Sequence, residues 1–184
     1  MVVTGIFMIL SSVVLATNAR FGNLIILQNL ANDMALSVRQ AQVYGIAVRR
    51  YQGTNFDVSY GMHFTLPAAD TASIYELFAD VNRNGIYDTG DSIIESTTLK
   101  GGYSITALCA RAVGSSVEDC TVEQLDVVFR RPEPDACISV GGSTTFNSNF
   151  ACVSTYDKAS IRVDSNRGQT ATVVVEMSGQ ISAK

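Results

Sequence analysis

The chain begins with an apolar run that carries no charge. Residues 1–19 read MVVTGIFMILSSVVLATNA, and Arg20 is the only charged residue before Asp33. As a helix rising about 1.5 Å per residue, this run covers about 29 Å, close to the thickness of a bilayer's hydrocarbon core. The pattern predicts a helix of a membrane or a filament core. The alternatives are a buried helix of a soluble domain and a signal peptide, which would need a basic region before the run.

The apolar pattern continues beyond this run as a stripe of helical periodicity. Its members recur at steps of three and four residues, as on one face of a helix. They are Leu24, Leu27, Ala31, Met34, Val38, Ala41, Gly45 and Val48. One helix is therefore expected to reach about Arg50, with an apolar half over 1–24 and an amphipathic half over 25–50. The small residues of the second half would let a sheet or another helix approach closely.

After Arg50 the pattern changes to short β-rich runs separated by Gly, Asn, Asp and Ser. The last two runs flank Asp164–Gly168, a turn sequence, and predict a C-terminal hairpin. The expected architecture is α+β: a long N-terminal helix packed on a small antiparallel sheet, with 51–184 as a β-rich head. The predicted strands are Phe56–Leu66, Ile74–Ala79, Ser92–Leu99, Tyr103–Ala110, Leu125–Arg130, Ala159–Val163 and Thr170–Ile181.

Composition narrows the class of protein. The 184 residues are 47% hydrophobic and 16% charged, with a net charge of −4. A disordered chain would be less hydrophobic and more charged, and a nucleic-acid-binding face would normally add a basic excess. A polytopic membrane protein is excluded too, because only one stretch is long and apolar enough to span. Two arginine pairs, Arg49–Arg50 and Arg130–Arg131, could form a small basic patch, but ordinary solvated pairs are favoured.

Four cysteines lie in the C-terminal half, at Cys109, Cys120, Cys137 and Cys152. Their spacing contains no C-x-x-C, which disfavours a zinc or thioredoxin-like site. In an exported head they would form two disulfides, whereas in a reducing compartment they would be buried thiols. Three connectivities are open. Pairing of neighbours closes the shortest loops and is preferred, with about 2–4 kcal/mol of stabilisation for each bridge.

The segment Asp80–Asp91 resembles a twelve-residue calcium loop. Oxygen-bearing side chains fall at positions 1, 3, 5, 9 and 12, a glycine falls at position 6, and position 7 would offer its carbonyl. Position 12 is an aspartate instead of the usual glutamate, and strands flank the loop, so it is not an EF-hand. The alternative is a plain hairpin turn at Asn84-Gly85. A structural Ca²⁺ ion would be held by Asp80, Asn82, Asn84, Ile86, Asp88 and Asp91.

Taken together, the order of elements resembles type IV pilins and the pseudopilins of type II secretion. The start MVVTGIFMILSSVVLA looks like the continuation of a prepilin N-terminus. The segment LANDMALSVRQAQVYGIAV, over 30–48, is similar to the helix of minor, H-type pseudopilins, and the closing MSGQIS is similar to that group's last strands. The resemblance covers residues 1 to about 50 well, is loose at the C-terminus and is absent between them.

The family's processing signal is missing. No Gly-Phe-Thr-Leu-Ile-Glu motif is present, and no glutamate precedes Glu76. We expect either that the sequence is trimmed or that its start was placed too late. A subunit that enters filaments differently is the remaining alternative.

The resemblance implies a structural subunit of a bacterial type IV pilus-like filament or secretion pseudopilus. Its partners would be copies of itself or other pilins, an inner-membrane assembly platform with its ATPase, and a prepilin peptidase. It would lie in the inner membrane before assembly and afterwards in a periplasmic pseudopilus or a surface pilus. The residues expected in the filament core are Ile6, Phe7, Ile9, Leu10, Val13, Val14 and Leu15.

Other functions remain open beside this one. The chain could be a minor pilin at a filament tip, acting as an adhesin or DNA-binding module, or a simple exported domain with one membrane anchor. An enzyme is not expected, because the one histidine, His63, lies in an alternating strand and no nucleophile has a recognisable context. Neither a small-molecule substrate nor nucleic acid is expected as a partner.

Overall fold

The computed structural model describes residues 2–47, 57–69 and 71–184, and within its helix the side chains of 15–21 and 23 are not described. The chain forms helix α1 (Val2–Ile46) and then ten strands. The strands are β1 (Ser59–Thr65), β2 (Ile74–Asp80), β3 (Ser92–Thr98), β4 (Tyr103–Ala112), β5 (Glu118–Val122), β6 (Gln124–Phe129), β7 (Ala136–Val140), β8 (Tyr156–Ser165), β9 (Thr170–Glu176) and β10 (Ile181–Ala183).

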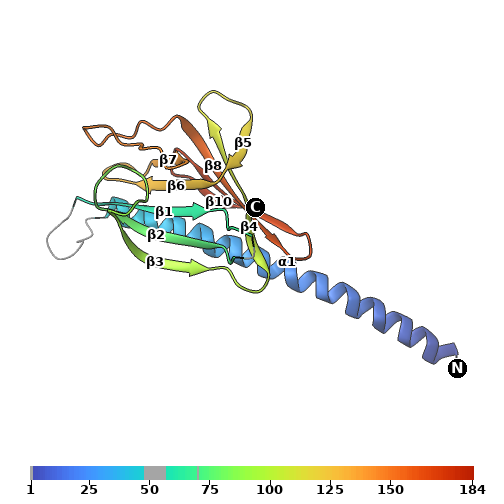
Figure 1. Cartoon of the computed structure of the whole chain (residues 1–184). Helices are drawn as coiled ribbons and strands as arrows, with labels where there is room; N and C mark the ends of the chain where they lie inside the picture. The colour runs from blue at the N-terminus through green and yellow to red at the C-terminus, as the bar shows by residue number, and fades with distance from the viewer. Residues whose placement is uncertain (1, 48–56, 70) are drawn as a thin grey trace.

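The strands form two antiparallel sheets of five strands each. The first has the order β3-β2-β1-β6-β7 and the second the order β10-β9-β8-β4-β5. The C-terminal hairpin predicted around Asp164–Gly168 is confirmed, because β8 and β9 pair in register from Lys158–Glu176 to Asp164–Thr170. Figure 1 shows the C-terminal half of α1 lying along the head, while its N-terminal half projects away from it.

The predicted apolar stripe of the helix is confirmed as its buried face. Leu27, Met34 and Val38 are fully buried, in one core with side chains from both sheets. Polar groups beside the stripe fix the helix further: Arg39 donates to the carbonyl of Ile181, and Gln42 donates to that of Pro134. The helix therefore belongs to the head through its second half. Leu24, at the start of the predicted stripe, is 48% exposed, and Val48 lies outside the described residues.

Gly45 shows why small residues occur on this face. A Cβ atom at this position would overlap the backbone carbonyl of Phe129 on β6, so any larger residue would push the helix and the sheet apart. The close approach expected from the small residues of the stripe is thus confirmed at its end.

The predicted fold class is wrong. The sequence suggested an α+β fold with one long helix on a small antiparallel sheet. The structure is instead mostly β, with two five-stranded sheets. The helical part whose side chains the structure describes consists of two stretches, residues 2–14 and 24–46, of 13 and 23 residues.

The difference comes from strands that periodicity does not reveal. Strand β5 reads EDCTV and is mostly polar, and β7 reads ACISV and is buried along nearly its whole length, so neither alternates clearly. The last predicted strand, Thr170–Ile181, is in fact β9, a turn, and the first residue of β10. Missing these strands made two sheets look like one.

Candidate functional site

The N-terminal half of α1 presents an apolar surface that the head does not cover. Every residue from 2 to 14 is exposed, including Phe7 at 70%, Ile9 at 65% and Leu10 at 60%. Ile6, Val13 and Val14 are more than half exposed as well, while the side chain of Leu15 lies outside the described residues. A continuous apolar surface of this kind on a protein indicates a contact with lipid or with another protein.

Within the described ranges, no helix combines the length and the apolar character that a membrane crossing requires.

Both predicted disulfides are present with the preferred pairing of neighbours. Cys109 is bonded to Cys120, which joins β4 to β5, and Cys137 is bonded to Cys152. The second bridge ties strand β7 to the loop 141–155 that follows it. That loop is fixed at its base by hydrogen bonds, since the amide of Val153 donates to the carbonyl of Thr145.

The predicted cation loop joins β2 to β3, two antiparallel neighbours, as the flanking strands suggested. Its side chains turn inwards and bind the loop's own backbone. The carboxylate of Asp80 accepts hydrogen bonds from the amides of Asn84 and Gly85, both at 3.1 Å. The carboxylate of Asp91 accepts from the amides of Val81 and Asp88. These bonds hold the loop in a compact turn.

The side-chain amides of Asn82 and Asn84 form hydrogen bonds with the third carboxylate of the loop, that of Asp88. Both donate to Asp88, at distances from 2.6 to 2.9 Å. In the part of the chain that the structure describes, no three His, Cys, Asp or Glu side chains lie close enough together to hold a metal ion. A Ca²⁺ ion would need amide oxygens to replace these donors, by rotation of the two Asn side chains. Calcium binding by this loop, including the carbonyl of Ile86, stays a prediction.

Burial makes Asp80 a weaker acid than an ordinary aspartate, because it raises the pKa of the carboxyl group. Its side chain is fully buried, and this burial, with the nearby charge of Asp91, raises its pKa from 3.8 to about 7 in spite of the backbone hydrogen bonds. Burial raises the pKa of Asp91 as well. Arg83, the basic residue of the loop, forms an ion pair with Asp57 at 2.7 Å and does not pair with Asp80 or Asp91. The inner side of the loop is therefore electrostatically suited to a cation or to a proton.

A buried polar pair lies on the face of the first sheet that this loop covers. Nδ1 of His63 on β1 is 2.5 Å from Oδ1 of Asp126 on β6, and the two residues are 8% and 0% exposed. The ring of Tyr87 lies over His63, with 4.6 Å between the ring centres. No sequence pattern indicates this pair, because its members are 63 residues apart. Its burial under Tyr87 favours a structural role.

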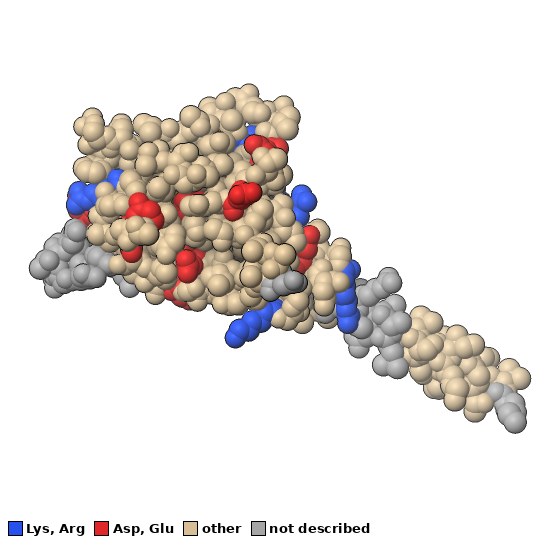
Figure 2. Space-filling model, in the orientation of Figure 1, with Lys and Arg blue, Asp and Glu red and all other residues tan. Residues whose placement is uncertain are grey.

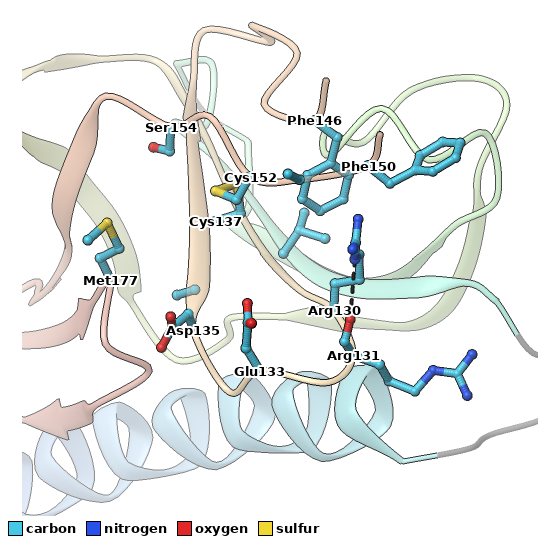
Figure 3. Close-up of a pocket in the computed structure, with 13 residues that line it drawn as sticks. Arg130, Arg131, Glu133, Asp135, Cys137, Phe146, Phe150, Cys152, Ser154 and Met177 are labelled. Carbon is cyan, nitrogen blue, oxygen red and sulfur yellow. Dashed lines mark hydrogen bonds between the residues drawn. A yellow bond between two sulfur atoms is a disulfide. The ribbon is translucent and has the colours of Figure 1, made fainter. Parts of the chain in front are cut away.

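A cavity of about 410 Å³ opens beside the second disulfide. Its floor is the segment after β6, with Arg130, Glu133 and Asp135, and its roof is the loop 141–155, with Phe146 and Phe150 (Figure 3). Sequence patterns could not reveal it, because the cavity depends on how this loop folds over the neighbouring segment.

The predicted basic patch is not tested by the structure. Arg49 and Arg50 lie outside the described residues. Arg131 has a carboxylate oxygen of Asp57 at 3.8 Å, and Arg130 is partly enclosed by the cavity. Figure 2 shows acidic and basic side chains interspersed over the visible face of the head.

Comparison with known proteins finds no match: no family model fits the chain, and no relative is found among curated proteins or among solved structures.

The raised pKa of Asp80 predicts a specific pH dependence of stability. An acid with a raised folded-state pKa binds more protons when folded, so its contribution to the free energy of unfolding falls as the pH rises from about 4 to about 7. The full effect is roughly 4 kcal/mol. Chemical denaturation in calcium-free buffer at several pH values should show this fall in the wild type. Asp80→Asn should lack it, and equal slopes for both proteins would contradict the prediction.

Calcium should stabilise the protein if the loop binds it. We expect the melting temperature at pH 7.5 to rise by at least about 3 °C in millimolar calcium relative to chelator. Asp88→Asn should remove this rise. Asp119→Asn is the matched control, because Asp119 also accepts a hydrogen bond from the backbone two residues on, but outside the loop. Equal melting temperatures of the wild type with calcium and with chelator would show that the loop is a plain hairpin connection that does not bind calcium.

The His63–Asp126 pair should contribute strongly to stability. His63→Leu leaves a buried carboxylate without its partner and should lower the free energy of unfolding by about 3 kcal/mol. His63→Leu with Asp126→Leu should cost clearly less than the sum of the two single changes. A cycle on Arg83 and Asp57, whose side chains are 28% and 69% exposed, should give less than about 1 kcal/mol of coupling. Additive effects at His63 and Asp126 would show that the two side chains are independent.

Proposed function

We propose that this chain is a structural subunit of a bacterial filament, a pilin or pseudopilin, which assembles through the apolar N-terminal half of α1. The observation that supports the proposal is the apolar surface over residues 2–14, which projects from the head and is exposed along its whole length. Removal of this surface from water is favourable at about 25 cal/mol per Å². The proposal rests on this helix surface and does not depend on the corrected fold class.

The two halves of α1 are suited to two different tasks. The second half is fixed by core contacts with both sheets, so the head cannot turn relative to it without breaking the core. The first half makes no contact of this kind and is free to pack beside helices of other subunits. In a filament the helices would form an apolar centre and the heads the outer surface.

The partners in this proposal come from the resemblance of the N-terminal 50 residues. They are copies of the chain or other pilins, an inner-membrane assembly platform with its ATPase, and a prepilin peptidase. The subunit would lie in the inner membrane before assembly and afterwards in a pseudopilus or a surface pilus. An ATPase is needed because assembly exchanges lipid contacts for helix contacts, which by itself gains little.

Both disulfides are consistent with this proposal. Disulfides persist in the periplasm and at cell surfaces, where an exported head would lie. Those of the head close short loops at its surface, with Cys120 and Cys152 both exposed.

The proposal predicts that a charge in the helix surface blocks assembly. On removal of detergent, the wild-type chain should form elongated, regular assemblies in electron micrographs and a fast-sedimenting species. Val13→Asp should prevent both, because a buried unpaired carboxylate costs several kcal/mol. Val113→Asp is the matched control, since Val13 and Val113 are 55% and 60% exposed but Val113 lies on the head. It should assemble as the wild type does.

Two outcomes would overturn the proposal. If the wild type stays monomeric in detergent and forms only amorphous aggregates without it, the helix is a plain anchor. If both aspartate variants assemble equally well, the assemblies are made by the heads and not by α1.

A further inference from the structure

The cavity beside the second disulfide is lined by a half-buried arginine, Arg130, that forms no ion pair with a described residue. Arg130 donates from Nε to the carbonyl of Arg131, while its Nη1 is buried and has no hydrogen-bond partner among the described residues. A buried donor left unpaired costs about 1–3 kcal/mol, and more when it is charged. Figure 3 shows the guanidinium beside the rings of Phe146 and Phe150. The charge of this arginine is not neutralised by a carboxylate of the described residues, so it attracts an anionic group in the cavity that it lines.

The same cavity carries carboxylates that do not satisfy this arginine. Glu133 and Asp135 line it and are exposed, and neither forms an ion pair with a described residue. Figure 3 shows both on the segment that leads from Arg131 towards β7, with Met177 beyond Asp135. Charges of opposite sign thus face one cavity without meeting each other, and the separation between them is room for a ligand that carries both charges.

The roof of the cavity beside Arg130 is apolar and well supported. The guanidinium of Arg130 lies 5.9 Å from the ring centre of Phe146, and that of Arg83 lies 5.2 Å from the ring centre of Phe150. The disulfide Cys137–Cys152 joins the roof to β7, so the cavity keeps its shape. Phe150 also has a positive φ of 59°, which is unfavourable for a residue with a side chain and is frequent at binding sites.

We propose that this cavity binds a small zwitterion, an amino acid or the ends of a short peptide, through the guanidinium of Arg130 and the opposing carboxylates of Glu133 and Asp135. The ligand carboxylate pairs with the guanidinium on its cavity side, the ligand ammonium group faces Glu133 and Asp135, and the apolar part of the ligand lies against Phe146 and Met177. A volume of about 410 Å³ is at the lower end of small-molecule sites, which suits a ligand of this size. This site is separate from the apolar helix and does not depend on filament assembly.

The experiment measures binding of leucine, dileucine and trileucine to the full chain in detergent micelles by isothermal titration calorimetry. The distance between the two ligand charges grows by about 3.5 Å for each added residue, so the tightest member distinguishes a free amino acid from a peptide. N-acetyl-leucine lacks the ammonium group and leucine amide lacks the carboxylate. Both should bind at least tenfold more weakly than the zwitterion of the same length.

Variants assign the two ends of the site. Arg130→Gln should weaken binding at least tenfold, whereas Arg162→Gln, an exposed arginine on β8 outside the cavity, should leave it unchanged. Glu133→Gln combined with Asp135→Asn should weaken zwitterion binding but leave that of N-acetyl-leucine unchanged. Thermal melting of each variant shows that it is folded. The proposal is overturned if no member of the series binds at about 10 mM ligand. It is also overturned if the blocked ligands bind as tightly as the zwitterion, or if the folded Arg130→Gln variant binds the zwitterion as the wild type does.

Discussion

The buried face of α1 is the contact on which the rest of the structure depends. Leu27, Ala31, Met34 and Val38 are all fully buried, and they lie in one core with apolar side chains of both sheets. The two sheets have separate strand orders and share no strand, and the helix packs against both of them in this core. At its end, Gly45 allows the backbone of β6 to come so near that no side chain would fit.

This constraint explains why one helix has two different surfaces. The head covers α1 from Leu27 onwards, and the buried face needs only the residues that recur at steps of three and four. Towards the N-terminus the head ends, so residues 2–14 have no sheet to contact, yet they are as apolar as the core. The head buries none of these side chains, so its own packing does not require their apolar character. Exposed apolar surface of this kind is typical of a contact with lipid or with another protein.

The sequence predicted features that depend on local spacing and missed those that depend on the path of the chain. The helical stripe, the hairpin after β8 and the pairing of neighbouring cysteines all follow from residues close in sequence, and all three are present. The second sheet was missed because β5, β7 and β10 are short or lack alternation. The His63–Asp126 pair and the cavity at Arg130 are formed by segments that are distant in the sequence. The periodicity of apolar residues predicts single elements and does not predict contacts between distant ones.

Two of the loops on the head act as one unit. The carbonyl of Asn84 accepts hydrogen bonds from the amides of Thr145 and Phe146, and the hydroxyl of Thr145 donates to the carbonyl of Gly85. The turn that surrounds Asp80 therefore supports the roof of the cavity through Phe146. Ionisation of Asp80 weakens that turn from the inside, because the carboxylate is fully buried. The position of Phe146 over Arg130 therefore depends on the same short run of backbone that surrounds Asp80.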